Sequence, residues 1–149
     1  MNSPDPAGGR SYIEASDANG RLVMERLLAG PVAMLNLLQF RSVADYSAFP
    51  DLAPAIPISG RAAYDLYMRH TMPFLEAAGG KVLFTAVGGH YLIGPVDEVW
   101  DMAILVEHAS LQALMDMANN PEYMAGMGHR TAALADSRLL PLELDQSLA

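Results

Sequence analysis

The spacing of apolar residues along the chain predicts four strands. The strand-like segments are 32–40, 81–93 with a bulge or bend at Gly88-Gly89, 99–107 and 136–144. The first of them, VAMLNLLQF, is apolar on both faces, so it should be covered on both sides. Pro141 cannot donate a ladder hydrogen bond, which indicates that part of the last strand lies at a sheet edge.

Helical spacing of apolar residues predicts three main helices, each with a recognisable start or end. They are 17–28, ended by Gly30-Pro31; 61–78, N-capped by Ser59; and a helix that begins after Ser110 and ends at Asn119-Asn120-Pro121. Pro73 is expected to kink or restart the second helix, because proline removes a backbone donor. Two short helical turns are expected over 122–135, and the proline-containing segment 41–60 predicts a long loop.

The order of elements after the first helix is βαββαβ. This order predicts an α+β, ferredoxin-like domain with an antiparallel four-stranded sheet and helices on one face. The other face would stay bare, and a second copy of the sheet would cover it, so we expect a homodimer that forms a dimeric α+β barrel. We divide the chain into a disordered tail (1–10), an N-terminal helical extension (11–30) and the barrel domain (31–149).

Charge and composition narrow the classes of function. The 149 residues carry 17 acidic and 9 basic side chains, and the net charge of −8 disfavours a nucleic-acid surface. No apolar run is long enough to span a membrane and no signal-peptide pattern is visible, so we expect a cytoplasmic protein with no membrane partner. The lack of cysteine excludes disulfides, thiolate metal sites and cysteine nucleophiles.

The common motifs of metal, nucleotide and serine-hydrolase sites are absent from the sequence. The four histidines show neither His-x-His nor His-x-x-x-His spacing, so no metal is expected. There is no Gly-x-Gly-x-x-Gly, Walker or Gly-x-Ser-x-Gly pattern, and we therefore expect no cofactor.

His129 and Arg130 are the most promising polar pair for chemistry. Arg130 could bind a carboxylate on a ligand, and His129 could transfer a proton. The structural interpretation, in which Arg130 pairs with Glu107, Glu122 or Asp136, is favoured, because ion-pair networks produce the same sequence pattern as sites do.

Four other polar residues are candidates for a site. Asn36 interrupts an apolar strand, so its amide needs partners: a ligand inside the barrel, backbone groups at a bulge, or groups across the subunit interface. Glu107 ends a strand and is either a base or, as favoured, half of a salt bridge. Tyr67 and His70 precede Pro73 on the long helix, where Tyr67 could contact a ligand and His70 could move a proton, although a surface histidine is the more common outcome.

Three segments resemble the domain-of-unknown-function 1330 family. They are GPVAMLNLLQF at 30–40, AAYDLYMRHTMPFL at 62–75 and, most specifically, PEYMAGMGHRTAALADSRL at 121–139. The resemblance implies a dimeric α+β barrel, a fold shared with cofactor-free monooxygenases, heme-degrading enzymes, chlorite dismutase-like and muconolactone isomerase-like proteins. In that family an arginine recurs seven residues after the tyrosine, as Arg130 follows Tyr123. The tryptophan that shorter members often carry before Pro-Glu-Tyr is missing here.

Two functions remain open at this point. The first is a cofactor-independent enzyme that acts on a small apolar or aromatic acid, with Arg130 holding the anion and His129 or His70 moving a proton. The second is a non-catalytic homodimeric protein that binds a small molecule or serves as a scaffold. Fold alone does not decide between them.

Overall fold

The computed structural model describes residues 11–144; the predicted tail at 1–10 and the last five residues lie outside the described range. The elements in chain order are α1 (Asp17–Glu25), β1 (Val32–Phe40), the short 3-10 helix η2 (Pro50–Leu52), α2 (Gly60–Ala77), β2 (Lys81–His90), β3 (Val99–His108), α3 (Leu111–Ala118), α4 (Pro121–Met124), α5 (Met127–Ala133) and β4 (Leu134–Glu143).

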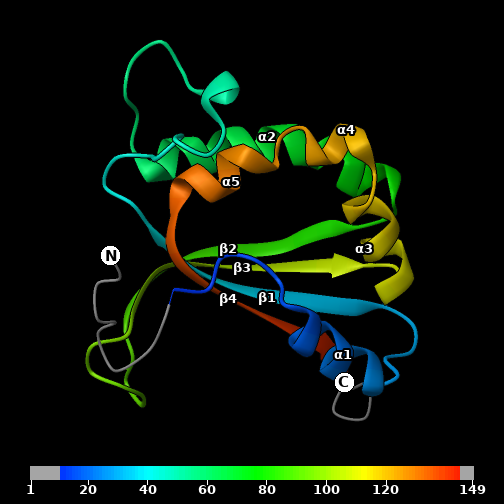
Figure 1. Ribbon diagram of the computed structural model, residues 1–149. Helices are drawn as coiled ribbons and strands as arrows, with labels where there is room; N and C mark the ends of the chain where they lie inside the picture. The colour runs from blue at the N-terminus through cyan, green and yellow to red at the C-terminus, as the bar shows by residue number, and fades with distance from the viewer. Residues whose placement is uncertain (1–10, 145–149) are drawn as a thin grey trace.

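The four strands form one antiparallel sheet in the order β2-β3-β1-β4. Helices α2, α4 and α5 lie over one face of it, with α3 at one end, as Figure 1 shows. The predicted ferredoxin-like βαββαβ fold is therefore confirmed, and β4, which contains Pro141, is an edge strand. Ser59 and Ser110 cap α2 and α3 as expected. The side-chain oxygen of each serine accepts a hydrogen bond of 3.0 Å from the backbone N–H three residues later in the chain.

Two local predictions are wrong, and a third is decided between its alternatives. Helix α1 ends at Glu25 rather than near residue 28, and Leu27 adopts a left-handed φ of 52°. The bulge in β2 lies between Val82 and Phe84, whereas the register continues without a shift through Gly88. A glycine fits at position 88 because a Cβ there would lie 2.3 Å from the carbonyl oxygen of Trp100. Of the two outcomes expected at Pro73, the restart does not occur, since α2 runs through it as one helix.

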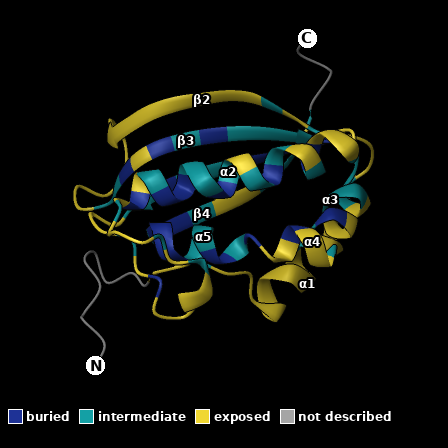
Figure 2. Cartoon of the chain, turned by 90° about the horizontal axis from the view of Figure 1, so that it is seen from above, coloured by how far each residue is buried: buried dark blue, intermediate teal, exposed yellow. Residues whose placement is uncertain are grey.

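The hydrophobic core lies between the helices and the sheet. Figure 2 shows buried residues in β3 and in helices α2 and α5, whereas β2 is exposed along most of its length. Leu38 on β1 is fully buried and lies opposite Met102 on β3 and Ser137 on β4. This register identifies the residues that share the helix-covered face of the sheet.

The other face of the sheet is apolar but has no helix over its centre (Figure 1). By register and alternation it carries Leu35, Leu37, Phe84, Ala103, Leu105 and Leu140. We call this set the open face. Two of its side chains, Phe84 and Leu140, are about half exposed. Within residues 11–144, no helix is both long and apolar enough to cross a membrane.

Candidate functional site

Three buried tyrosines form the centre of a polar cluster between α2 and α4. Tyr64 and Tyr67 lie one turn apart on α2, with ring centroids 5.3 Å apart, and the hydroxyl of Tyr67 is 2.7 Å from that of Tyr123 on α4. Burial raises the pKa of Tyr64 and of Tyr123 well above the usual value, so both hydroxyls stay protonated. Tyr67, predicted as a ligand contact, thus has a hydrogen-bond partner inside the protein.

His70 links α2 to the backbone of α4. Its Nε2 lies 2.8 Å from the carbonyl oxygen of Glu122 and 3.1 Å from that of Tyr123. Because carbonyl oxygens only accept, Nε2 carries a proton and donates it to both. Gly126 makes room for the ring, since a Cβ there would lie 2.1 Å from the His70 Cδ2 atom. This geometry gives His70 a structural contact; its predicted catalytic role stays a prediction.

His129 on α5 pairs with a residue that the sequence analysis did not single out. The hydroxyl of Tyr46 is 2.7 Å from the His129 Nδ1, and the two rings meet edge to face at 82°. Burial lowers the pKa of His129, and the proximity of His70 lowers it further, so the imidazole is neutral at pH 7. A neutral imidazole bonded through Nδ1 presents Nε2 as either a donor or an acceptor, depending on the tautomer.

The loop 41–60 positions Tyr46. Its two ends meet, since Gly60 N donates to Arg41 O at 2.9 Å, and Asp45 N donates to Ala132 O on α5 at 2.9 Å. Side chains of this loop lie against α5, where a Cβ on Gly128 would meet Phe49 at 2.6 Å. The loop is therefore docked along α5, from Gly128 to Ala132. Its unusual length was the only sequence signal that pointed to it.

Arg130 binds backbone and hydroxyl groups rather than a carboxylate. Its Nη1 donates to the carbonyl oxygen of Ile13 at 2.5 Å, and its Nη2 lies 3.5 Å from the Ser137 Oγ, at the limit of a hydrogen bond. The predicted ion pairs of Arg130 are wrong: within residues 11–144 it makes none, and Asp136 pairs with Arg138 at 2.7 Å instead. Arg130 thus ties the N-terminal segment to α5 and β4.

Asn36 and Glu107 lie apart from this cluster. Asn36 is on the helix-covered face, where its Nδ2 donates to Met34 O at 3.2 Å and to Ile104 O at 3.3 Å, so backbone groups are its partners. Glu107 is at the other end of the sheet from Arg130, because β3 ends where β1 begins, whereas α5 enters β4 beside the end of β1. The prediction that Glu107 lies near Arg130 is wrong.

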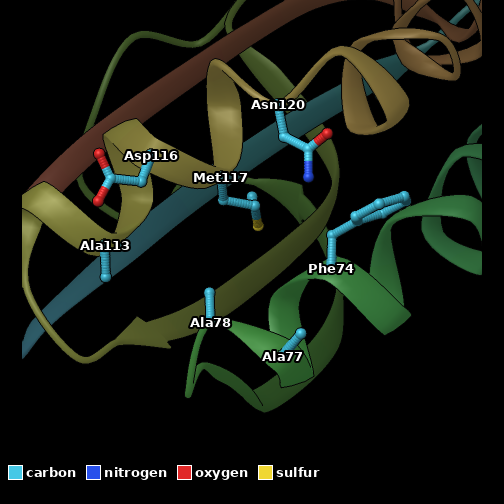
Figure 3. Close-up of a pocket in the computed structure, with 7 residues that line it drawn as sticks. All are labelled: Phe74, Ala77, Ala78, Ala113, Asp116, Met117 and Asn120. Carbon is cyan, nitrogen blue, oxygen red and sulfur yellow. The ribbon is translucent and has the colours of Figure 1, made fainter.

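A surface pocket lies between the C-terminal half of α2 and helix α3, not beside Arg130. It has a volume of about 420 Å³, and Figure 3 shows side chains reaching it from both helices. Its wall residue Phe74 has its ring 5.3 Å from that of His70 and 6.4 Å from that of Tyr123, so the tyrosine cluster lies behind this wall. The lining residues are Phe74, Ala77, Ala78, Ala113, Asp116, Met117 and Asn120.

Within the described residues, no group of three or more histidine, cysteine, aspartate or glutamate side chains is arranged to hold a metal ion. The polar groups described above are neutral tyrosines, two histidines and one guanidinium. Such a set can orient an anion and exchange a proton.

Fold and geometry together define an α+β protein with a ferredoxin-like domain and a tyrosine-rich cluster under its helices. No family model and no curated protein matches the chain, so the resemblance to the 1330 family stays a prediction.

Two solved structures similar to this chain show which family it belongs to. The methylated RPA0582 protein is 31% identical, with a TM-score of 0.79 over 93% of this chain and 98% of that chain. A second structure of RPA0582, a protein of unknown function from Rhodopseudomonas palustris, is 33% identical, with a TM-score of 0.77 over 91% of this chain and 98% of that chain. The chain belongs to the same family as this protein. SnoaB, a cofactor-independent oxygenase from Streptomyces nogalater, is 13% identical with a TM-score of 0.47 over 80% of this chain and 98% of that chain, which is too distant to bear on function.

Proposed function

We propose that this chain is a homodimeric, cofactor-independent enzyme that binds a small apolar or aromatic acid beside His129 and exchanges a proton with it. The main support for this proposal is the Tyr46–His129 pair, which is joined by a 2.7 Å hydrogen bond and in which burial keeps the imidazole neutral. A neutral imidazole whose orientation is held by a hydroxyl can serve as a general acid or base near pH 7.

The surroundings of His129 favour an aromatic or apolar ligand. Tyr46 lies on one side of the imidazole, and His70, which lowers the pKa of His129, lies close enough to act through charge. The tyrosine cluster behind His70 supplies aromatic surface and hydroxyl groups. Arg130 follows His129 on α5 and supplies a cation; a ligand carboxylate is a stronger acceptor than the Ile13 carbonyl that now binds its guanidinium.

The scaffold function is favoured by a separate observation. Arg130, Asn36 and Tyr67 each have partners within the protein, as expected of residues that hold a fold together. In that case His129 would pair with Tyr46 only to attach the loop 41–60 to α5. The Tyr46–His129 hydrogen bond therefore orients a catalytic imidazole under the first function and only attaches the loop under the second. A ligand titration distinguishes the two functions.

The test is a titration with benzoate, monitored by the ¹H–¹³C NMR signals of the histidine rings. Each of the four histidines gives its own signal, so the same spectra report binding at His129 and His70 and any non-specific effect at the other two histidines. The proposal expects saturable shifts at His129 and His70, and a raised pKa of His129 in the complex, because a bound anion favours the imidazolium.

The matched variants are His129→Gln, which should weaken benzoate binding at least tenfold, and His90→Gln, which should not change it. His90 is exposed and lies on the edge strand β2, which two strands separate from β4 and α5. Equal shifts at all four histidines, or none at millimolar benzoate, would contradict the binding proposal and support the scaffold function.

The homodimer is supported by the open face. A contiguous set of leucines and Phe84 on the centre of a sheet is unusual on the surface of a monomer, and a second copy of the same face would cover it. Sedimentation equilibrium at micromolar concentration should give twice the chain mass. A monomer under these conditions would overturn this part of the proposal.

A further inference from the structure

The loop between β2 and β3 presents nearly fully exposed aliphatic side chains. Leu92 is 99% exposed, Ile93 92% and Val96 86%. We call residues 91–98 the arm. Single exposed leucines are common on protein surfaces, but several within six residues form a patch, and such patches usually mark an interaction site.

The arm is held in one shape by polar contacts at its base. The hydroxyl of Tyr91 donates to Glu98 at 2.7 Å, and the indole nitrogen of Trp100 donates to the Tyr91 hydroxyl at 2.7 Å. The guanidinium of Arg138 lies over the Trp100 ring at 4.9 Å. Because these contacts hold its base in the free protomer, the arm would lose less conformational entropy on binding a partner than a loop without them.

The arm and helix α1 lie on the same side of the sheet but at opposite ends. Figure 1 shows the yellow-green arm bending away from α2 and α5 toward the open face, and α1 on that same side at the other end. The pairings agree, since the arm follows His90, near the end of β1, while Ala29 N donates to the Glu143 carboxylate beside the start of β1 at 2.9 Å.

Helix α1 lacks the cover that so short a helix needs. It has nine residues and none of them is buried, while Leu22 is 62% exposed and Leu27, just after the helix, 83%. Isolated helices shorter than about 12 residues are marginal in water, and most of their stability in proteins comes from packing an apolar side. The exposed leucines therefore indicate a packing partner.

The open face is by itself somewhat small for a stable interface. Four strands spaced about 4.8 Å apart and about 30 Å long give a face of roughly 600 Å². A typical specific interface buries about 800 Å² on each partner. Contacts outside the sheet would supply the rest, and the arm and α1 are the exposed apolar features that border it.

We propose that the arm of one protomer docks on α1 of a second copy of this chain, through a twofold axis that runs across the strands. This inference rests on the proposed homodimer. An axis across the strands exchanges the two ends of the sheet, so each arm lies at the same end of the dimer as the partner's α1, where the docking that we propose would cover both apolar sets. An axis along the strands would bring arm against arm and leave α1 exposed.

Disulfide cross-linking tests the contact, because the chain contains no cysteine of its own. The double variant Leu92→Cys/Leu22→Cys should form a covalent dimer under mild oxidation, as judged by non-reducing electrophoresis. Leu92→Cys alone and Leu22→Cys alone should not. Cross-linking of Leu92→Cys alone would show an arm-to-arm contact and overturn the proposal.

A second measurement separates failure of the arm contact from failure of the dimer. Leu92→Asp/Ile93→Asp should raise the dimer dissociation constant at least about 100-fold, because two arms lose their burial in each dimer. The control Ile56→Asp changes an aliphatic residue that is also highly exposed, 71%, but lies in the loop 41–60 on the helix side. An unchanged dissociation constant in the arm variant would refute the docking while leaving the dimer intact; a monomeric wild type would refute both.

Discussion

The two faces of the sheet carry similarly apolar side chains, but helices lie over only one of them. On the helix side Leu38, Met102 and Ile104 are nearly inaccessible to water. Two residues on the edge strands of that side, Val87 and Leu139, are 86% and 51% exposed. On the open side Leu37, Ala103 and Leu105 remain partly accessible, and Phe84 and Leu140 are about half exposed. Residues of the central strands thus form one set that folds the protomer and another that would serve the proposed association.

The polar residues follow the same division. The tyrosine cluster, His70 and His129 are on the helix side, where burial raises the pKa of Tyr64 and Tyr123 and lowers the pKa of His129. The open side also carries charge: by register Arg138 lies opposite Leu37 in the middle of β4, and it pairs with Asp136 at 2.7 Å. Chemistry is therefore expected under the helices and association on the opposite face.

The largest expected effect comes from truncating one leucine on each face. Leu38→Ala should lower the free energy of unfolding by about 2–5 kcal/mol at every protein concentration, because it leaves a cavity in the core. Leu37→Ala should lower it by less, and mainly at concentrations where the proposed dimer is populated, because in that dimer the side chain packs against a second chain. Urea unfolding at two concentrations tenfold apart measures both. An equal, concentration-independent loss in both variants would contradict the division between the two faces.

The second-largest effect is expected from truncating Arg130. Arg130→Ala should lower the free energy of unfolding by about 1.5–3 kcal/mol, since its guanidinium donates to Ile13 O and to the Ser137 hydroxyl. Thermal unfolding provides the measurement, and Arg61→Ala, which breaks an exposed pair with Asp65, is the control, with a change below about 1 kcal/mol. A stable Arg130→Ala protein that no longer binds benzoate would instead assign Arg130 to the ligand.

The smallest expected effect is the pH dependence of stability. His108 is buried, its Nδ1 has no partner within the described residues, and burial lowers its pKa, as it does that of His129. The unfolded chain, with a histidine pKa near 6.5, then binds protons more readily, so stability is full above about pH 6.5 and decreases as the pH falls below it.

Melting temperatures between pH 7.5 and 5.5 measure this effect, a window in which carboxylates change little. His108→Gln should reduce the slope. A melting temperature that stays constant or rises toward pH 5.5 would show that neither histidine is buried in its neutral form.

Much of the fold could be predicted because it depends on local patterns. The bounds of β1, the serine caps of α2 and α3 and the βαββαβ order follow from periodicity and capping chemistry, and the structure confirms them. The position of the bulge in β2 could not be predicted, because it depends on how Phe84 pairs with Leu105 across the sheet. Gly88-Gly89 was the more visible signal, but a close approach to Trp100 explains Gly88 without a bulge.

The candidate site was predictable only in part. His129 and Arg130 were identified as a pair, but their partners Tyr46 and Ile13 lie 83 and 117 residues away in sequence, and no periodicity links them. Adjacent residues on a helix point about 100° apart, so His129 faces the loop 41–60 while Arg130 faces the N-terminal segment. The sequence placed Glu107 at the end of a strand, but it could not show which end of the sheet that strand would reach.

The sequence alone determined the elements, the fold class and an apolar surface too large for one chain to cover, because alternation, helical spacing and caps act over short distances. Only the tertiary structure decided which polar residues meet. Hydrogen bonds such as those of Tyr46 to His129 and of Tyr67 to Tyr123 join segments that the chain separates by more than fifty residues. Their formation depends on how helices pack on the sheet, and that packing minimises exposed apolar area over the whole domain rather than along any one segment.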